Sequence, residues 1–158
     1  MRLNLLRVVI SGGQTGVDRA ALDVAREAGL EAGGWCPAGR RAEDGPIAAR
    51  YPLRETPSAD PAERTEWNVR DSDGTLVLTT GPLHGGTERT VQAAHAHGKP
   101  LLVVELARGE DPGYVAEWIA ERGIRVLNVA GPRESEVPGI YERAATFLAG
   151  VFGLPPES

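Results

Sequence analysis

The chain contains very little cysteine, lysine and aromatic side chain. Its 158 residues include one cysteine, Cys36, and one lysine, Lys99, and only 5% of them are aromatic. A single thiol excludes an internal disulfide and a cysteine-based metal cluster, and His84, His95 and His97 show no metal-ligand spacing. We therefore expect no protein-held metal and a core built mainly from aliphatic side chains.

Long apolar runs and an excess of positive charge are also missing. No apolar stretch approaches the length of a membrane-spanning helix, and the first one is too short for a signal peptide. The net charge of −5 argues against broad binding to nucleic acid or to a membrane surface. We expect a cytoplasmic protein with neither kind of partner. With 41% hydrophobic residues, the chain is suited to a single domain of 158 residues.

Apolar, β-rich runs alternate with helical patterns along the chain. The predicted strands are residues 5–10, 75–80, 100–106 and 125–130, with a weaker fifth at 31–35. The predicted helices are residues 17–28, 88–97, 112–122 and 137–152, with a short one at 61–70. This alternation predicts an α/β, Rossmann-like, doubly wound fold, with a mainly parallel sheet and helices on both faces. Such sheets bind ligands at the carboxyl ends of their strands.

A glycine-rich turn joins the first strand to the first helix. It reads Ser11-Gly12-Gly13-Gln14-Thr15-Gly16-Val17-Asp18-Arg19. Such a turn brings the backbone close to a ligand and directs free helix N–H groups at an anion such as phosphate. The alternative is an ordinary tight turn, since the glycine order is not that of the dinucleotide fingerprint. The expected ligand contacts are Gly12, Gly13, Gln14, Thr15, Gly16, Asp18 and Arg19.

Asp18 complicates this expectation, because a carboxylate repels a nearby anion. Either Arg19 offsets its charge, or Asp18 faces a hydroxyl group or a ring nitrogen of the ligand.

A second glycine loop, residues 79–90, repeats the arrangement after another strand. Its expected ligand contacts are Thr80, Gly85, Gly86, Thr87 and Thr90. Two such loops predict one shared site for a phosphorylated small molecule across adjacent strand ends. Two unrelated turns are the alternative.

Residues 36–73 interrupt the alternation as a proline-rich, polar insertion, which we interpret as an ordered segment that covers a ligand or contacts another subunit. Arg40 and Arg41 are expected to clamp a phosphate, with carboxylates orienting them. Polar and aromatic side chains are expected to face a heterocycle. The alternatives are a solvated loop, a plain turn and, for the cysteine, a small buried side chain. The remaining candidates are Trp35, Cys36, Glu43, Asp44, Asn68, Asp71 and Ser72.

Five motifs together carry a family resemblance. They are residues 11–19, Gly33-Gly34-Trp35-Cys36-Pro37, residues 39–45, Glu66-Trp67-Asn68-Val69-Arg70-Asp71-Ser72-Asp73 and Gly85-Gly86-Thr87. Over about residues 8–104 the chain resembles the family named "putative molybdenum carrier", the circularly permuted YpsA-like branch of the SLOG superfamily. The resemblance implies a Rossmann-like fold, a homo-oligomer (dimer or tetramer) and a pocket for a nucleotide-like ligand. The family's name points to molybdenum cofactor (molybdopterin), a phosphorylated pterin that holds molybdenum.

The wider superfamily includes phosphoribohydrolases whose second loop reads Pro-Gly-Gly-x-Gly-Thr-x-x-Glu. When the threonine of that loop is aligned with Thr87, Thr90 stands where the catalytic glutamate would be, which favours binding over hydrolysis. We therefore expect a carrier of a phosphorylated heterocyclic small molecule, either a nucleotide or molybdenum cofactor. The alternatives are an N-glycosidase acting on nucleoside monophosphates and a nucleotide-ligand sensor. Carboxylate candidates for the N-glycosidase are Glu43, Asp44, Asp71 and Glu88.

Overall fold

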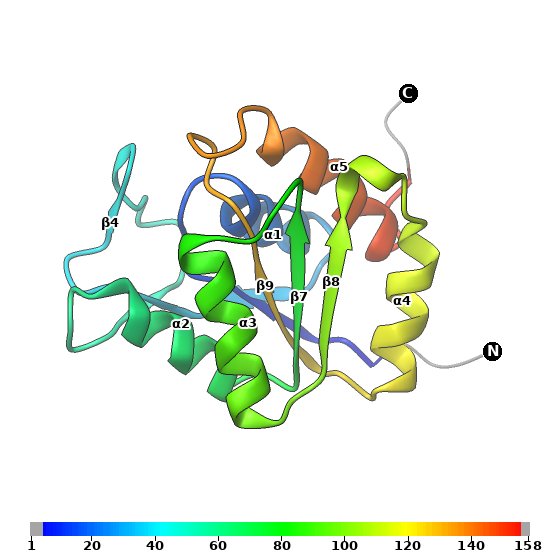
Figure 1. Cartoon of the computed structure of the whole chain (residues 1–158), viewed down its shortest axis with the longest axis horizontal. Helices are drawn as coiled ribbons and strands as arrows, with labels where there is room; N and C mark the ends of the chain where they lie inside the picture. Colours follow the sequence, from blue (N-terminus) through cyan, green and yellow to red (C-terminus); the bar gives the residue numbers. More distant parts are fainter. Residues whose placement is uncertain (1–4, 156–158) are drawn as a thin grey trace.

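The computed structural model describes residues 5–155 and has a central sheet of five parallel strands (Figure 1). The strands are β1 (Val8–Ile10), β2 (Glu31–Gly33), β7 (Gly74–Thr79), β8 (Leu101–Glu105) and β9 (Val126–Ala130). Their order is β2-β1-β9-β7-β8, and every neighbouring pair is parallel. All six residues of β7 are buried, as expected for a strand covered on both faces.

Helices cover both faces of this sheet. The helices are α1 (Val17–Glu27), α2 (Pro61–Arg70), α3 (Gly85–His97), α4 (Pro112–Glu121) and α5 (Ile140–Val151), with a short 3₁₀ turn, η1, at Leu106–Arg108. On one face α1 and α4 both pack against α5, while α2 packs against α3 on the other. The expected Rossmann-like, doubly wound fold is thereby confirmed.

Several element boundaries differ from the predicted ones, and β1 starts at Val8, three residues later than expected. The single strand expected at 31–35 is two strands, β2 and β3 (Trp35–Cys36), because the chain turns at Gly34. Gly34 has φ +124°, and a Cβ there would lie 2.4 Å from the carbonyl oxygen of Ser11. Helix α3 starts at Gly85, so that its glycines form the first helical turn. Helix α5 starts three residues later than expected, after Gly139 in a left-handed conformation.

The insertion folds into short strands and one helix. It contains β4 (Arg41–Ala42), β5 (Gly45–Pro46), β6 (Arg54–Glu55) and α2. Strands β4 and β5 form an antiparallel hairpin, and β6 pairs in parallel with β3. A small apolar cluster joins the insertion to α1 through Leu22, Cys36, Ile47, Tyr51 and Leu53. The insertion therefore has its own packed base and stands beside the sheet.

The main core is largely aliphatic, as the composition predicts. Strands β7 and β9 contribute four fully buried side chains, Leu76, Leu78, Leu127 and Val129. Burying one such side chain contributes about 1.5–3 kcal/mol to stability. None of the helices in the described part of the chain is long and apolar enough to cross a membrane.

The position of β9 favours a crevice at the carboxyl ends of the central strands. This last strand lies between β1 and β7, the two strands that precede the glycine loops. The chain leaves β9 towards α5 on one face and leaves β7 towards α3 on the other. Parallel sheets open a ligand-binding crevice where neighbouring connections diverge in this way.

Candidate ligand-binding site

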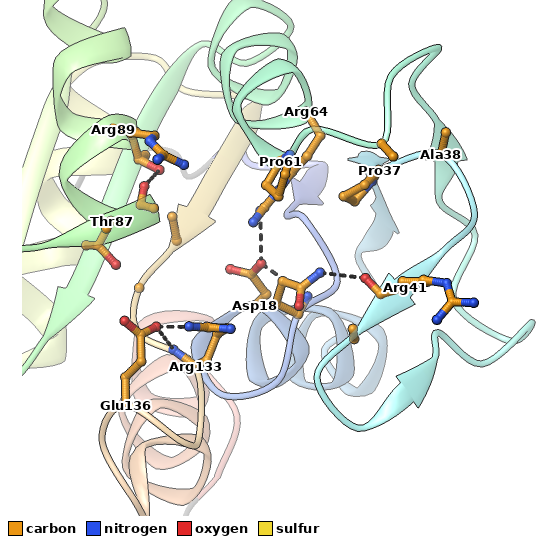
Figure 2. A pocket seen from close by; sticks show the side chains of 18 residues that line it. Asp18, Pro37, Ala38, Arg41, Pro61, Arg64, Thr87, Arg89, Arg133 and Glu136 are labelled. Carbon is orange, nitrogen blue, oxygen red and sulfur yellow. Dashed lines mark hydrogen bonds and ion pairs between the residues drawn. The ribbon is translucent and has the colours of Figure 1, made fainter.

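A cavity of about 450 Å³ opens at this crevice (Figure 2). Its volume suits a small-molecule ligand. The β1–α1 loop contributes Gln14 and Asp18, and the β9–α5 segment contributes Ala130, Gly131, Arg133 and Glu136. The insertion contributes Pro37, Ala38, Arg41, Ala42, Ala59, Pro61 and Arg64. Helix α3 contributes Gly85, Gly86, Thr87, Arg89 and Thr90. The structure thus brings the second glycine loop and part of the insertion together around one space.

The N-terminus of α3 is open to the cavity. The residue before the helix, His84, makes no side-chain capping hydrogen bond. A Cβ placed on Gly86 would meet no described atom within 4 Å beyond the neighbouring residues and backbone of α3. Thr87 lies in the same first turn and lines the cavity. Backbone N–H groups of an uncapped helix start, together with the helix dipole, favour an anion at this position.

The N-terminus of α1, in contrast, is closed by the protein itself. The backbone N–H of Val17 donates to the carbonyl oxygen of Pro132 at 3.2 Å. A Cβ on Gly16 would lie 2.4 Å from that same oxygen. The Asp18 carboxylate accepts the backbone N–H of Gln14 at 3.2 Å. The donors that the sequence suggests for a phosphate are therefore already used, in part by an internal carboxylate.

Only Gln14 and Asp18 of the first glycine loop reach the cavity wall. The other five predicted contacts, Gly12, Gly13, Thr15, Gly16 and Arg19, lie outside its lining. The two glycine loops were expected to present their backbone N–H groups to the ligand in the same way, but only the second loop has its backbone open to the cavity. The cause is tertiary, because the β9–α5 segment packs onto the first loop and leaves the second one open.

Arg64 fills the space above Gly12 and pairs with Asp18. A Cβ on Gly12 would lie 1.8 Å from Nη1 of Arg64, so the glycine makes room for a guanidinium group. The Arg64 Nη1 lies 3.4 Å from Oδ2 of Asp18, whose side chain is only 5% exposed. Burial raises the pKa of the Asp18 carboxyl, and the charge of Arg64 opposes that rise.

Sequence reasoning missed Arg64. A signal was present, because Arg64 precedes Asn68, a predicted site residue, by four positions on the same helix. Residues four apart on a helix share a face. Arg89 was missed although it lies within the second glycine loop, whereas no local pattern marked Arg133 and Glu136.

The cavity concentrates positive charge in an acidic protein. Four arginines line it against two carboxylates, in a chain of net charge −5. Arg133 is paired through Nε with Oε1 of Glu136 at 3.1 Å. Arg89 is exposed, and within residues 5–155 its side chain has no hydrogen bond or ion pair. In Figure 2 its guanidinium group points towards the same space as Arg64. An anionic ligand would complement this excess.

The two arginines expected to form a phosphate clamp have different roles. The Arg40 guanidinium donates to the carbonyl oxygens of Leu53, Ala48 and Tyr51 at 2.9–3.0 Å, and it lies outside the cavity lining. Arg41 does line the cavity, and its carbonyl oxygen accepts from Nε2 of Gln14 at 3.0 Å. Its guanidinium points away from the centre of the cavity (Figure 2).

Glu43 and Asp44 attach the β4–β5 hairpin to two neighbouring loops and to α1. Glu43 accepts hydrogen bonds from the hydroxyl groups of Thr15 and Ser135. Asp44 forms a two-point pair with Arg19, with Nη2 to Oδ1 at 2.8 Å. These bonds lower the pKa of both carboxyls. Neither side chain lines the cavity.

The lowered pKa of Glu43 predicts acid-dependent stability. A carboxyl whose pKa falls on folding, here from about 4.5, stabilises the fold above that pH. This stability is lost as the pH drops through the lowered folded-state value. Melting temperatures measured from neutral to acidic pH should therefore fall less steeply for Glu43→Gln than for the wild type. The exposed Glu27→Gln serves as control, and equal slopes for Glu43→Gln and wild type would contradict the expectation.

The polar group around Trp35 also lies outside the cavity lining. Asn68 accepts the backbone N–H of Trp35 at 2.8 Å and donates to its carbonyl oxygen at 3.0 Å. The indole N–H donates to Asp71 at 2.8 Å, and the Ser72 hydroxyl donates to Val69 at 2.9 Å. The contacts with Trp35 fix α2 against β3, and the Ser72 bond closes the end of α2.

Two further candidates do not reach the cavity lining either. Cys36 is fully buried in the apolar cluster beneath the insertion, and burial raises the pKa of its thiol. Thr80 lies at the end of β7, outside the lining.

Comparison with known proteins agrees with this architecture. The model of the circularly permutated YpsA SLOG family matches residues 9–152, so the chain belongs to that family. Among solved structures, it is similar to the crystal structure of "Putative molybdenum carrier protein" from Syntrophus aciditrophicus SB, at 1.45 Å resolution. The two sequences are 43% identical, the match covers 94% of this chain and 96% of the other, and the TM-score is 0.88. None of the curated proteins matches this chain. The family resemblance seen in the sequence is confirmed.

Proposed function

We propose that this protein binds a phosphorylated heterocyclic small molecule in the cavity, with the phosphate at the N-terminus of α3. The observation that carries the proposal is the open first turn of that helix, where the space that a Cβ of Gly86 would occupy is free. Arg89 follows Gly86 by three positions on the same face of α3 and has no hydrogen-bond or ion-pair partner within residues 5–155. A phosphate there would receive backbone N–H groups and a charge-assisted bond together.

The opposite wall of the cavity suits the heterocycle. The insertion presents Pro37, Ala38 and Pro61 to the cavity, beside two alanines. These side chains offer apolar contact area and no charge. A ligand with an anionic end and a flat, partly apolar ring would thus find a matching wall for each part. Nucleotides and molybdenum cofactor both have this form.

We favour molybdenum cofactor as the cargo, because the similar crystal structure carries the name of a putative molybdenum carrier. The residues that line the cavity include no cysteine or histidine. Within the described part of the chain, no three histidine, cysteine, aspartate or glutamate side chains are grouped as metal ligands. The cavity would therefore hold the cofactor by its phosphate and pterin, with the molybdenum kept on the pterin as cargo.

No observation favours the N-glycosidase alternative. Its candidate carboxylates Glu43, Asp44 and Asp71 are hydrogen-bonded to other residues of the chain. Glu88 is exposed and lies outside the cavity lining. The Thr90 hydroxyl donates to the carbonyl oxygen of Gly86 at 3.0 Å, which gives it a role within the helix. A nucleotide sensor would use the same cavity. Homo-oligomer formation and a cytoplasmic location stay predictions.

The proposal is tested by native mass spectrometry of the intact protein, with molybdenum analysis and pterin fluorescence after loading with the cofactor. Nucleoside monophosphates are assayed in parallel against the matching nucleosides, with free base measured in the same samples. We expect one phosphorylated ligand per chain, no release of base, and weaker binding by about tenfold in Arg89→Gln. The exposed Arg122→Gln at the end of α4 is the control. Equal binding of nucleoside and nucleotide, or full affinity in Arg89→Gln, would contradict the proposal.

A further inference from the structure

Arg64 is a cation with too few partners. Its side chain is 14% exposed, and its one ion pair, to Asp18, spans 3.4 Å from Nη1 to Oδ2. Among the described residues, its Nε is the single buried side-chain nitrogen or oxygen without a hydrogen-bond partner. A guanidinium carries five N–H donors, and its bonds to carboxylates are normally about 2.7–2.9 Å long. The group is largely withdrawn from water without the bonds that would compensate for this.

The fold nevertheless holds this cation in place. Arg64 comes from α2 in the insertion and reaches across to the β1–α1 loop, where Gly12 leaves room for it. It lines the cavity, and in Figure 2 it points towards Asp18 beneath the open space. Asp18 itself is fastened by the backbone N–H of Gln14. The carboxylate thus offers Arg64 a weak contact from a fixed position.

We propose that Arg64 is an anion-binding residue of the cavity and that the carboxylate of Asp18 competes with the ligand's phosphate for it. This inference rests on the proposed function and adds a specific donor from the insertion to the anion site at α3. A phosphate in the cavity would supply the short, charge-assisted bonds that Asp18 does not. The insertion would then contribute affinity as well as an apolar wall, which links its packing to ligand binding.

The first test measures the binding of inorganic phosphate to the full chain by ³¹P NMR titration. We expect Arg64→Gln to bind phosphate at least about tenfold more weakly than the wild type, and Arg64→Lys to lie between them because it keeps the charge but loses the planar group. Arg70→Gln is the control, since Arg70 lies on the same helix outside the cavity lining. Unchanged affinity in folded Arg64→Gln and Arg64→Lys would overturn the inference.

The second test reverses the direction of the effect. Asparagine keeps an oxygen that can accept the Gln14 N–H, but it removes the charge that repels phosphate and attracts Arg64. Asp18→Asn should therefore bind inorganic phosphate several-fold more tightly than the wild type. Equal or weaker binding at an unchanged melting temperature would show that Asp18 does not compete, and would overturn that part of the inference.

The two proposals fail in different ways. Wild-type protein that binds neither inorganic phosphate nor a phosphorylated heterocycle would contradict the proposed function. Wild-type binding that Arg64→Gln and Arg64→Lys leave unchanged would contradict the role of Arg64 alone.

Discussion

Replacement of Gly86 by aspartate should abolish binding of phosphorylated ligands and leave the fold intact. The new side chain enters open space, since no described atom beyond the neighbouring residues and backbone of α3 lies within 4 Å of the position that its Cβ would take. A carboxylate in the first turn of a helix suits the helix dipole, so the melting temperature should hardly change. The same carboxylate would occupy the position expected for the phosphate and repel it. We expect an affinity loss of about a hundredfold or more, equivalent to about 2.7 kcal/mol.

Isothermal titration with a nucleoside monophosphate and with molybdenum cofactor would measure this loss. Gly86→Ala is the matched control, because it adds the Cβ without the charge and should retain most of the affinity. Retained binding in a folded Gly86→Asp variant would place the phosphate elsewhere. Gly12→Asp would not be equivalent, since its Cβ would lie 1.8 Å from Nη1 of Arg64. That substitution displaces Arg64 and confounds structure with binding.

Replacement of Arg40 by methionine should produce the largest loss of stability in the insertion. The Arg40 guanidinium holds the stretch after the β4–β5 hairpin by donating to the carbonyl oxygens of Ala48, Tyr51 and Leu53. Removal of the donors leaves these oxygens without their charged partner, and bonds to charged groups contribute about 1.5–3 kcal/mol each, not additively. We expect the free energy of unfolding to fall by about 3 kcal/mol.

Urea denaturation followed by fluorescence would measure this change, since Trp35 and Trp67 pack edge to face at the base of the insertion. Arg41→Met is the matched control. The Arg41 side chain has no hydrogen bond within residues 5–155, so its replacement should change stability by less than about 0.5 kcal/mol. A stable Arg40→Met variant with weakened ligand binding would instead support the phosphate clamp expected from the sequence.

Arg40 and Arg41 could not be distinguished from the sequence alone. They are adjacent, have the same chemistry and received the same predicted role, yet one is bound to backbone oxygens and the other lines the cavity. Arg40 also has a left-handed backbone conformation, φ 51°, and its side chain lies against the insertion. No local pattern reports such a conformation in a residue other than glycine.

The two glycine loops likewise have similar local sequences and different surroundings in the structure. Both follow a strand and precede a helix, so local rules treat them alike. Packing of the β9–α5 segment closes the first loop through Pro132, and the second stays open at Gly86. The contact joins positions more than a hundred residues apart, and its existence depends on β9 lying between β1 and β7. Strand order is a long-range property that apolar periodicity does not encode.

Local sequence patterns were sufficient to predict the alternation of strands and helices, the helices on both faces of the sheet, and the family. Periodicity, helix boundaries and short motifs are properties of neighbouring residues, so the sequence reports them directly. Helix α2 was predicted with its observed bounds, Pro61–Arg70, and the structure shows that Asp60 caps it and Pro61 starts it. Tertiary structure alone decided the position of β9, the opening of α3 to the cavity and the placement of Arg64 over Gly12. Each of these depends on which distant surfaces pack together, and the burial and charge of a side chain follow from that packing.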